Sequence, residues 1–115
     1  MNDLGHLSIS VKLAIKTASV DDEHAFGRGV ADLCLGVRET GSLNAAAKRM
    51  NMAYSKAWRV VREAEAQLGF DLLDRDGPRG STLTSDGEKL LTAYLEVLEE
   101  LQREAETIFA DRTAG

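Results

Sequence analysis

The chain has 115 residues, of which 43% are hydrophobic; this is enough for one modest core, so we expect a single globular domain over residues 1–115. No apolar run could span a bilayer and the N-terminus lacks a signal-peptide pattern, which predicts a cytoplasmic protein with no membrane partner. The formal net charge of −5 differs from that of most free-standing nucleic-acid modules, which are basic.

The first predicted element covers residues 8–26. Apolar side chains occupy every second position near its start, the pattern of a strand buried on one face: Ile9, Val11, Leu13 and Ile15. An acidic turn at residues 21–23 and a short return strand at residues 25–26 would complete a hairpin. The Gly-x-Gly at residues 27–29 lacks the third glycine of a dinucleotide-binding loop, so it indicates a turn from strand to helix.

A three-helix core is predicted over residues 29–68. Its first helix should run from about residue 29 to residue 40 and bury an apolar face of Val30, Leu33, Cys34 and Val37. Cys34 is the only cysteine, and its apolar neighbours favour a buried structural thiol over a metal ligand or a redox group. Neither histidine has a second ligand at metal spacing, so we expect no metal site and no cofactor.

Residues 42–68 have the pattern of a helix-turn-helix. Gly41 suits the left-handed position that ends a helix, and Ser42 can cap the helix that follows. Three consecutive alanines at residues 45–47 would let a second helix cross closely at a steep angle. The inward face of that second helix comprises Ala57, Val60, Val61, Ala64 and Leu68.

The outward face of this motif is basic. Five lysine or arginine residues and no acidic residue lie between residues 44 and 62 of an otherwise acidic chain: Lys48, Arg49, Lys56, Arg59 and Arg62. Phosphate groups select such side chains, but an ordinary solvated helix face has the same composition, and charge alone favours that second interpretation. For Trp58 we favour packing at the edge of the core over contact with a base.

Two short strands and a long helix complete the chain. Residues 69–84 place apolar segments on either side of a Gly- and Pro-containing turn, the pattern of a β-hairpin wing. A helix over residues 85–110, capped by Ser85 or Thr84, would be about 39 Å long. Its coiled-coil-like stripe is our predicted dimer interface: Leu91, Tyr94, Leu98, Leu101, Ala105 and Ile108. The alternative is a helix whose stripe packs on its own domain.

Residues from about 29 to 109 resemble the winged helix-turn-helix domain of the ModE and LysR families of bacterial transcription regulators. The residues that carry the similarity are 39–43, 45–48, 52–58, 68–69, 72–75 and 83–87. Tyr54 followed by Ala57 and Trp58 favours ModE over LysR. Ala53 stands where the family often has a capping serine, so the cap passes to Ser55 or is missing. The resemblance implies a mainly α fold with a small β component, an N-terminal strand and a long C-terminal dimerisation helix.

The resemblance also implies a homodimeric, sequence-specific regulator that binds double-stranded DNA and is not an enzyme. We expect DNA contacts from nine residues of the motif and the wing: Asn44, Lys48, Tyr54, Ser55, Lys56, Arg59, Arg62, Arg75 and Arg79. ModE and LysR regulators carry molybdate-binding or effector domains after the winged helix, and these 115 residues contain neither, so we expect no molybdate binding. The alternative is a winged-helix interaction module that modulates another regulator by heterodimerisation through its acidic helix.

Overall fold

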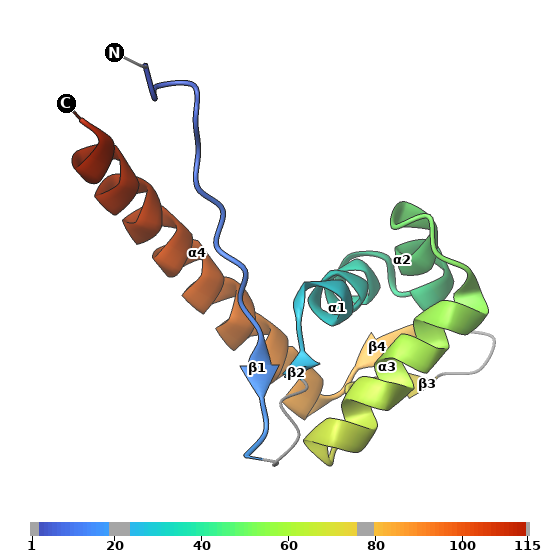
Figure 1. Cartoon of the computed structure of the whole chain (residues 1–115). Coiled ribbons are helices and arrows are strands. Elements are labelled where there is room, and N and C mark those ends of the chain that lie inside the picture. The colour runs from blue at the N-terminus through green and yellow to red at the C-terminus, as the bar shows by residue number, and fades with distance from the viewer. Residues whose placement is uncertain (1–2, 19–23, 76–79, 115) are drawn as a thin grey trace.

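The computed structural model describes residues 3–18, 24–75 and 80–114. That part of the chain contains, in order, β1 (Ile15–Lys16), β2 (His24–Phe26), α1 (Arg28–Thr40), α2 (Leu43–Arg49), α3 (Tyr54–Leu68), β3 (Leu73–Arg75), β4 (Ser81–Leu83) and α4 (Ser85–Thr113). The predicted fold class, mainly α with a small β component, is therefore confirmed. The helix-turn-helix consists of α2 and α3 (Figure 1).

Helices α1, α2 and α3 pack around one apolar core. Its largest fully buried side chains are Phe26, Leu33, Val37, Leu43, Val61, Leu72, Leu91 and Cys34. The close approach of α1 to α2 depends on Gly36, because a Cβ atom there would lie 2.5 Å from the Cβ of Ala46. Ala46, one of the alanines predicted to let α3 cross α2 closely, thus also permits the close contact between α2 and α1.

The predicted wing is the hairpin of β3 and β4, in which Leu73 lies opposite Leu83. Its return strand is joined to the turn between α1 and α2, because the backbone N–H of Ser81 donates to the carbonyl of Gly41 at 3.0 Å. This bond holds the loop-side end of the β3–β4 ladder beside the helix-turn-helix. The predicted contact residue Arg79 lies outside the described residues.

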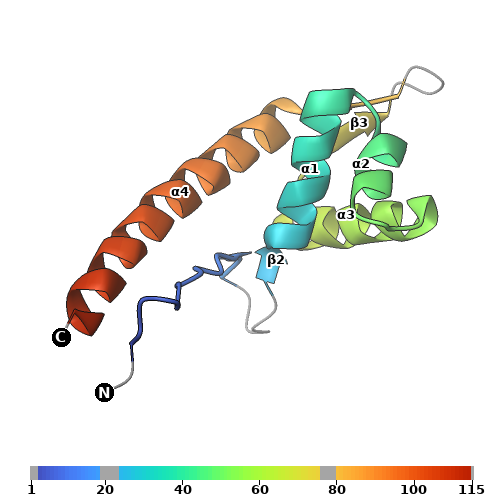
Figure 2. The ribbon, with the colours of Figure 1, turned by 90° about the horizontal axis from the view of Figure 1, so that it is seen from above.

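The long helix α4 runs from Ser85 to Thr113, three residues beyond its predicted end. Thr84 is its N-cap, since the hydroxyl oxygen accepts from the N–H of Gly87 at 2.9 Å. Arg38 of α1 forms an ion pair with Glu88 near the start of α4. Beyond this contact α4 projects away from the other three helices, and the molecule measures 59 × 33 × 22 Å (Figure 2).

The N-terminal segment lies along α4 (Figure 1). Exposure alternates over residues 9–16, as a half-buried strand requires. In this segment, however, only β1 pairs with another strand, β2. The predicted strand is therefore wrong for residues 9–14. Gln102 of α4 supplies the partner instead. Its Oε1 accepts from the N–H of Val11 and its Nε2 donates to the carbonyl of Ile9, both at 2.8 Å. A helix side chain thus replaces the neighbouring strand.

Two residues of the predicted dimer interface belong to the core of the chain itself. The side chain of Leu91 is fully buried and Tyr94 is 2% exposed. The Tyr94 ring packs edge-on against Phe26 with centroids 5.3 Å apart, and its hydroxyl donates to the carbonyl of Leu13 at 2.9 Å. These two side chains are therefore buried within the chain itself, and their place in a dimer interface stays a prediction.

Candidate nucleic-acid interface

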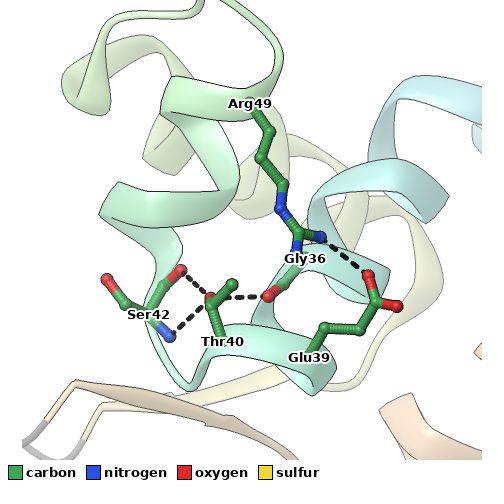
Figure 3. A network of polar contacts seen from close by, with 5 residues as sticks. All are labelled: Gly36, Glu39, Thr40, Ser42 and Arg49. Carbon is green, nitrogen blue, oxygen red and sulfur yellow. Dashed lines mark hydrogen bonds and ion pairs between the residues drawn. The ribbon is translucent and has the colours of Figure 1, made fainter.

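The turn between α1 and α2 fixes where α2 begins (Figure 3). Gly41 ends α1 with a left-handed φ of 73°, as predicted. The Thr40 hydroxyl lies 2.6 Å from the carbonyl of Gly36 and accepts from the N–H of Ser42 at 3.2 Å. Ser42 then caps α2, because its Oγ accepts from the N–H of Ala45 at 3.1 Å. These bonds give α2 a defined start on which α3 can pack.

Four of the five basic residues of the motif remain available to a ligand. Arg49 is the exception, since its guanidinium donates to the carboxylate of Glu39 at 2.7 Å (Figure 3). Lys48, Lys56 and Arg59 are exposed and form no ion pair with any residue that the structure describes. No ion pair among the described residues therefore neutralises their charges.

The exposed face of α3 carries these charges because its apolar face is buried. Ala57, Val61 and Ala64 have 0%, 0% and 4% of their surface exposed, while Arg59 and Arg62 are exposed. The period of a helix separates the two sets of side chains onto opposite faces. Helix α3 thus presents a basic surface to solvent, as the sequence predicted.

The first turn of α3 is open to solvent. Tyr54, Ser55 and Lys56 are all exposed there, with 47% of the Tyr54 surface accessible. Ala53 occupies the N-cap position and no side chain caps the helix, so Ser55 does not take over that role. The N–H groups of this turn can therefore donate to an acceptor from outside, such as a phosphate oxygen.

Trp58 joins α3 to the wing. Its side chain is 8% exposed and belongs to the core, which confirms the packing prediction. The guanidinium carbon of Arg75, on β3, lies 4.1 Å from the centroid of the indole ring, and that of Arg62 lies 5.4 Å away. One cation of the wing and one cation of α3 therefore meet at a single aromatic ring.

Predicted contact residues from three elements meet around an open cleft of about 630 Å³. The cleft is lined by the start of α2, the first turns of α3 and the loop-side end of the β3–β4 ladder: Ser42, Leu43, Asn44, Tyr54, Trp58, Arg75, Gly80 and Ser81. It brings Asn44, Tyr54 and Arg75 together although they are distant in sequence. Lys48, Lys56 and Arg59 are exposed on α2 and α3 but do not line it.

The helix-turn-helix and wing match proteins of a known family. Residues 32–88 match the family described as bacterial regulatory helix-turn-helix protein, lysR family. A crystal structure of the CbnR DNA-binding domain with DNA is 31% identical, with a TM-score of 0.62 over 72% of this chain and 94% of that one. Full-length CbnR is described as a LysR family transcriptional regulator. The chain belongs to the LysR family.

Other solved structures share the fold of this LysR-type domain. The BenM DNA-binding domain in complex with benA site 1 DNA is 21% identical, with a TM-score of 0.63 over 75% of this chain and 96% of that one. Vibrio fischeri DarR in complex with DNA is 17% identical, with a TM-score of 0.63 over 83% of this chain and 31% of that one. These identities support the fold alone. No curated protein matches the chain significantly.

The LysR-type domain covers 28% of full-length CbnR, with 32% identity and a TM-score of 0.59. It is a helix-turn-helix domain of the class found in DNA-binding transcription regulators. The preference for ModE that Tyr54 and Trp58 suggested stays a prediction. None of the helices in the described ranges is long and apolar enough to cross a membrane. Within the same ranges, no three histidine, cysteine or acidic residues cluster as metal ligands would.

A buried carboxylate of the LysR-type domain was missed by the sequence analysis. Glu65 is 8% exposed, and its Oε2 accepts from the N–H groups of Leu72 at 2.7 Å and Leu73 at 3.2 Å. These bonds tie the start of the wing to α3 and so help to place Arg75. The available signal was its position, because Glu65 follows Val61 by four residues on the inward face of α3.

Proposed function

We propose that this LysR-type domain binds double-stranded DNA sequence-specifically and regulates transcription as a homodimer. The observation that carries the proposal is the exposed basic face of α3, whose Lys56 and Arg59 have no acidic partner among the described residues. A related domain at 31% identity was solved with DNA, which supports the same use of the fold here.

In this proposal α3 enters the major groove with its N-terminal turn foremost, as recognition helices do. Tyr54 and Ser55 contact the groove, and Lys56 and Arg59 contact base edges or the adjacent backbone. A side chain that makes two hydrogen bonds to one base contributes about 1 to 3 kcal/mol of discrimination between sequences. The Tyr54 and Trp58 pattern supports a recognition helix of the ModE type.

Other elements contact the DNA backbone. Asn44, Lys48 and Arg62 bind phosphates on both sides of the groove, while Arg75 and Arg79 of the wing reach the neighbouring groove. These contacts supply affinity and orientation rather than sequence discrimination. Because the chain as a whole is acidic, with a net charge of −5, the local basic surface and not the overall charge must attract DNA.

An exposed apolar stripe on α4 supports the homodimer. Val97, Leu101 and Ile108 are 44%, 42% and 47% exposed, and their spacing places them with Ala105 on one face of the helix. The adjacent face, which includes Leu98, is partly covered by the chain itself. We therefore propose that a second copy packs on the uncovered stripe, with Val97 added to the predicted interface.

The proposal is tested by selecting bound duplexes from a random DNA pool and following the affinity of the enriched sequence against salt concentration. We expect an enriched inverted repeat, because a two-fold dimer presents two recognition helices to related half-sites. We also expect the affinity to fall as salt rises. Absence of enrichment, with weak binding at low salt only, would contradict sequence-specific binding.

Two matched alanine variants assign the roles. Arg59→Ala should weaken binding to the selected sequence more than binding to unrelated DNA, whereas Lys48→Ala should weaken both equally and make the salt dependence shallower. Equal losses for Arg59→Ala on both DNAs would reassign Arg59 to the backbone.

A further inference from the structure

The side chain of Trp58 contacts three residues of the proposed DNA surface. The guanidinium carbon of Arg75 lies 4.1 Å from the ring centroid and that of Arg62 lies 5.4 Å away. The ring of Tyr54 meets the indole edge-on, with centroids 6.4 Å apart and an interplanar angle of 88°. Trp58 itself is 8% exposed, so it supports these groups from beneath.

The side chain of Arg75 lies over this ring. Its side chain is exposed and forms no hydrogen bond or ion pair with any residue that the structure describes. A guanidinium stacks well on an aromatic face because it is planar and more weakly hydrated than an ammonium group. A guanidinium held in this way still has N–H donors that a phosphate oxygen can accept.

The choice of tryptophan is informative, because the indole Nε1 is buried without a hydrogen-bond partner among the described residues. An unpaired buried donor is unfavourable, and leucine or phenylalanine would fill core space without introducing one. The indole ring provides a wide π surface that can hold cations, whereas leucine has none and phenylalanine has a smaller one. Filling the core is therefore not a sufficient account of this residue.

We infer that Trp58 is a positioning residue that fixes Arg75 of the wing and Arg62 of α3 relative to each other, so that both elements present their cations to the DNA backbone as one unit. The cleft of about 630 Å³ beside the ring, lined by Asn44 and Arg75 as well, is the place where a backbone phosphate would lie. This inference rests on the proposed function and adds to it a coupling between the recognition helix and the wing.

The test is a double-mutant cycle on DNA binding with the full chain. Trp58→Leu keeps an apolar side chain without a π surface, and Arg75→Ala removes the cation. Arg75→Ala should weaken binding to the selected duplex about tenfold and Trp58→Leu at least as much, and the double variant should be little weaker than Trp58→Leu alone. Trp58→Leu should also lower the salt slope by about one to two, at least as much as Arg75→Ala does, although it removes no charge.

Two controls separate positioning from folding. Trp58→Phe retains a stacking face and should restore most of the affinity and the salt slope. Arg59, on the same helix, has no ring contact, so the effects of Trp58→Leu and Arg59→Ala should multiply in the double variant. Thermal unfolding followed by circular dichroism shows whether each variant is folded at the binding temperature.

The outcomes are distinct. The inference would be overturned if the effects of Trp58→Leu and Arg75→Ala multiplied in the double variant, or if Trp58→Leu left the salt slope unchanged. Neither result would contradict the proposed DNA-binding function. If Trp58→Leu does not fold, Arg75→Ala in the free protein still gives a test, because removing a stacked cation should shift the fluorescence of Trp58, and an unchanged spectrum would overturn the contact. Failure of the wild-type chain to bind DNA would instead refute the proposed function.

Discussion

At the scale of single residues, buried polar groups hold the binding surface in place. Glu65 is 8% exposed and accepts two backbone hydrogen bonds from the segment that leads into the wing. The N–H groups of Leu72 and Leu73 cannot readily donate to solvent instead, because both residues are buried. A single carboxylate thus connects the position of α3 to that of β3.

Replacing Glu65 by alanine should lower the free energy of unfolding by about 3 kcal/mol, since two buried N–H donors lose a charged acceptor. Glu65→Gln retains one acceptor oxygen and should lose less. Urea denaturation of both variants measures the difference. Glu63→Ala is the control, because Glu63 is exposed on the same helix and its loss should change stability by no more than about 0.5 kcal/mol. Equal stability of the wild type and Glu65→Ala would contradict the role assigned to this carboxylate.

The Cys34 thiol should be inert in the folded protein. Burial raises its pKa from 9.0 to about 12, with the Glu65 carboxylate adding to the rise and Arg38 opposing it. The reactive thiolate is therefore scarce at neutral pH, and a thiol reagent should label the protein only after denaturation. Because the unfolded thiol ionises first, the contribution of this group to stability is complete below pH 9.0 and is lost as the pH rises toward about 12. Rapid stoichiometric labelling of the native protein would contradict this account.

At the scale of elements, side-chain contacts rather than backbone hydrogen bonds join neighbouring segments at two places. Gln102 of α4 bonds to the backbone of Ile9 and Val11, so residues 9–14 remain extended without a neighbouring strand. Trp58 connects α3 to β3 through stacking. Both contacts join segments that are far apart in sequence, and neither belongs to a helix or sheet hydrogen-bond pattern.

Gln102→Ala should release the N-terminal segment from α4. We expect faster amide exchange at Val11 and a loss of about 1 kcal/mol in stability, since two hydrogen bonds at a partly buried site are removed. Gln102→Glu keeps an acceptor for the N–H of Val11 but cannot donate to the carbonyl of Ile9, so protection at Val11 should be largely retained. Hydrogen exchange followed by NMR reports both variants. Unchanged exchange at Val11 in Gln102→Ala would show that side-chain packing alone holds the segment.

At the scale of the whole molecule, charge and shape separate the proposed DNA-binding surface on α3 from the proposed dimer interface on α4. Residues 91–115 contain two basic and six acidic residues, and this part of α4 projects away from the helix-turn-helix (Figure 2). The acidic end would be repelled by DNA, so the proposed orientation places the basic face of α3 toward DNA and α4 away from it. The exposed stripe of α4 is then free for a second copy.

Leu101→Glu should convert the proposed dimer to a monomer, because it places a charge in the middle of the apolar stripe. Light scattering after size-exclusion chromatography measures the mass. Thr107→Glu adds the same charge at an exposed position outside the stripe and should leave the mass unchanged. A dimer that survives Leu101→Glu would place the interface elsewhere on the molecule, and a monomeric wild type would refute the homodimer.

Local sequence signals were sufficient for the helices and for several of their ends, although α4 extends three residues beyond its predicted end. The left-handed glycines at residues 41 and 69 end α1 and α3, and Ser42 caps α2, since these roles depend on backbone conformation and neighbouring N–H groups alone. The basic face of α3 was equally predictable, because helical period determines which side chains share a face. The wing followed from its turn residues, although residues 76–79 lie outside the described ranges.

The tertiary structure decided what depends on contacts between distant segments. The stripe of α4 reads as one continuous pattern, yet Leu91 and Tyr94 are buried within the chain while Leu101 and Ile108 are exposed. Periodicity identifies an apolar face but not its partner. In the same way, alternation predicted the exposure of residues 9–16 but not a helix as their neighbour. The stacking of Arg75 on Trp58 joins residues 17 positions apart, and only the packing of the wing against α3 brings them together.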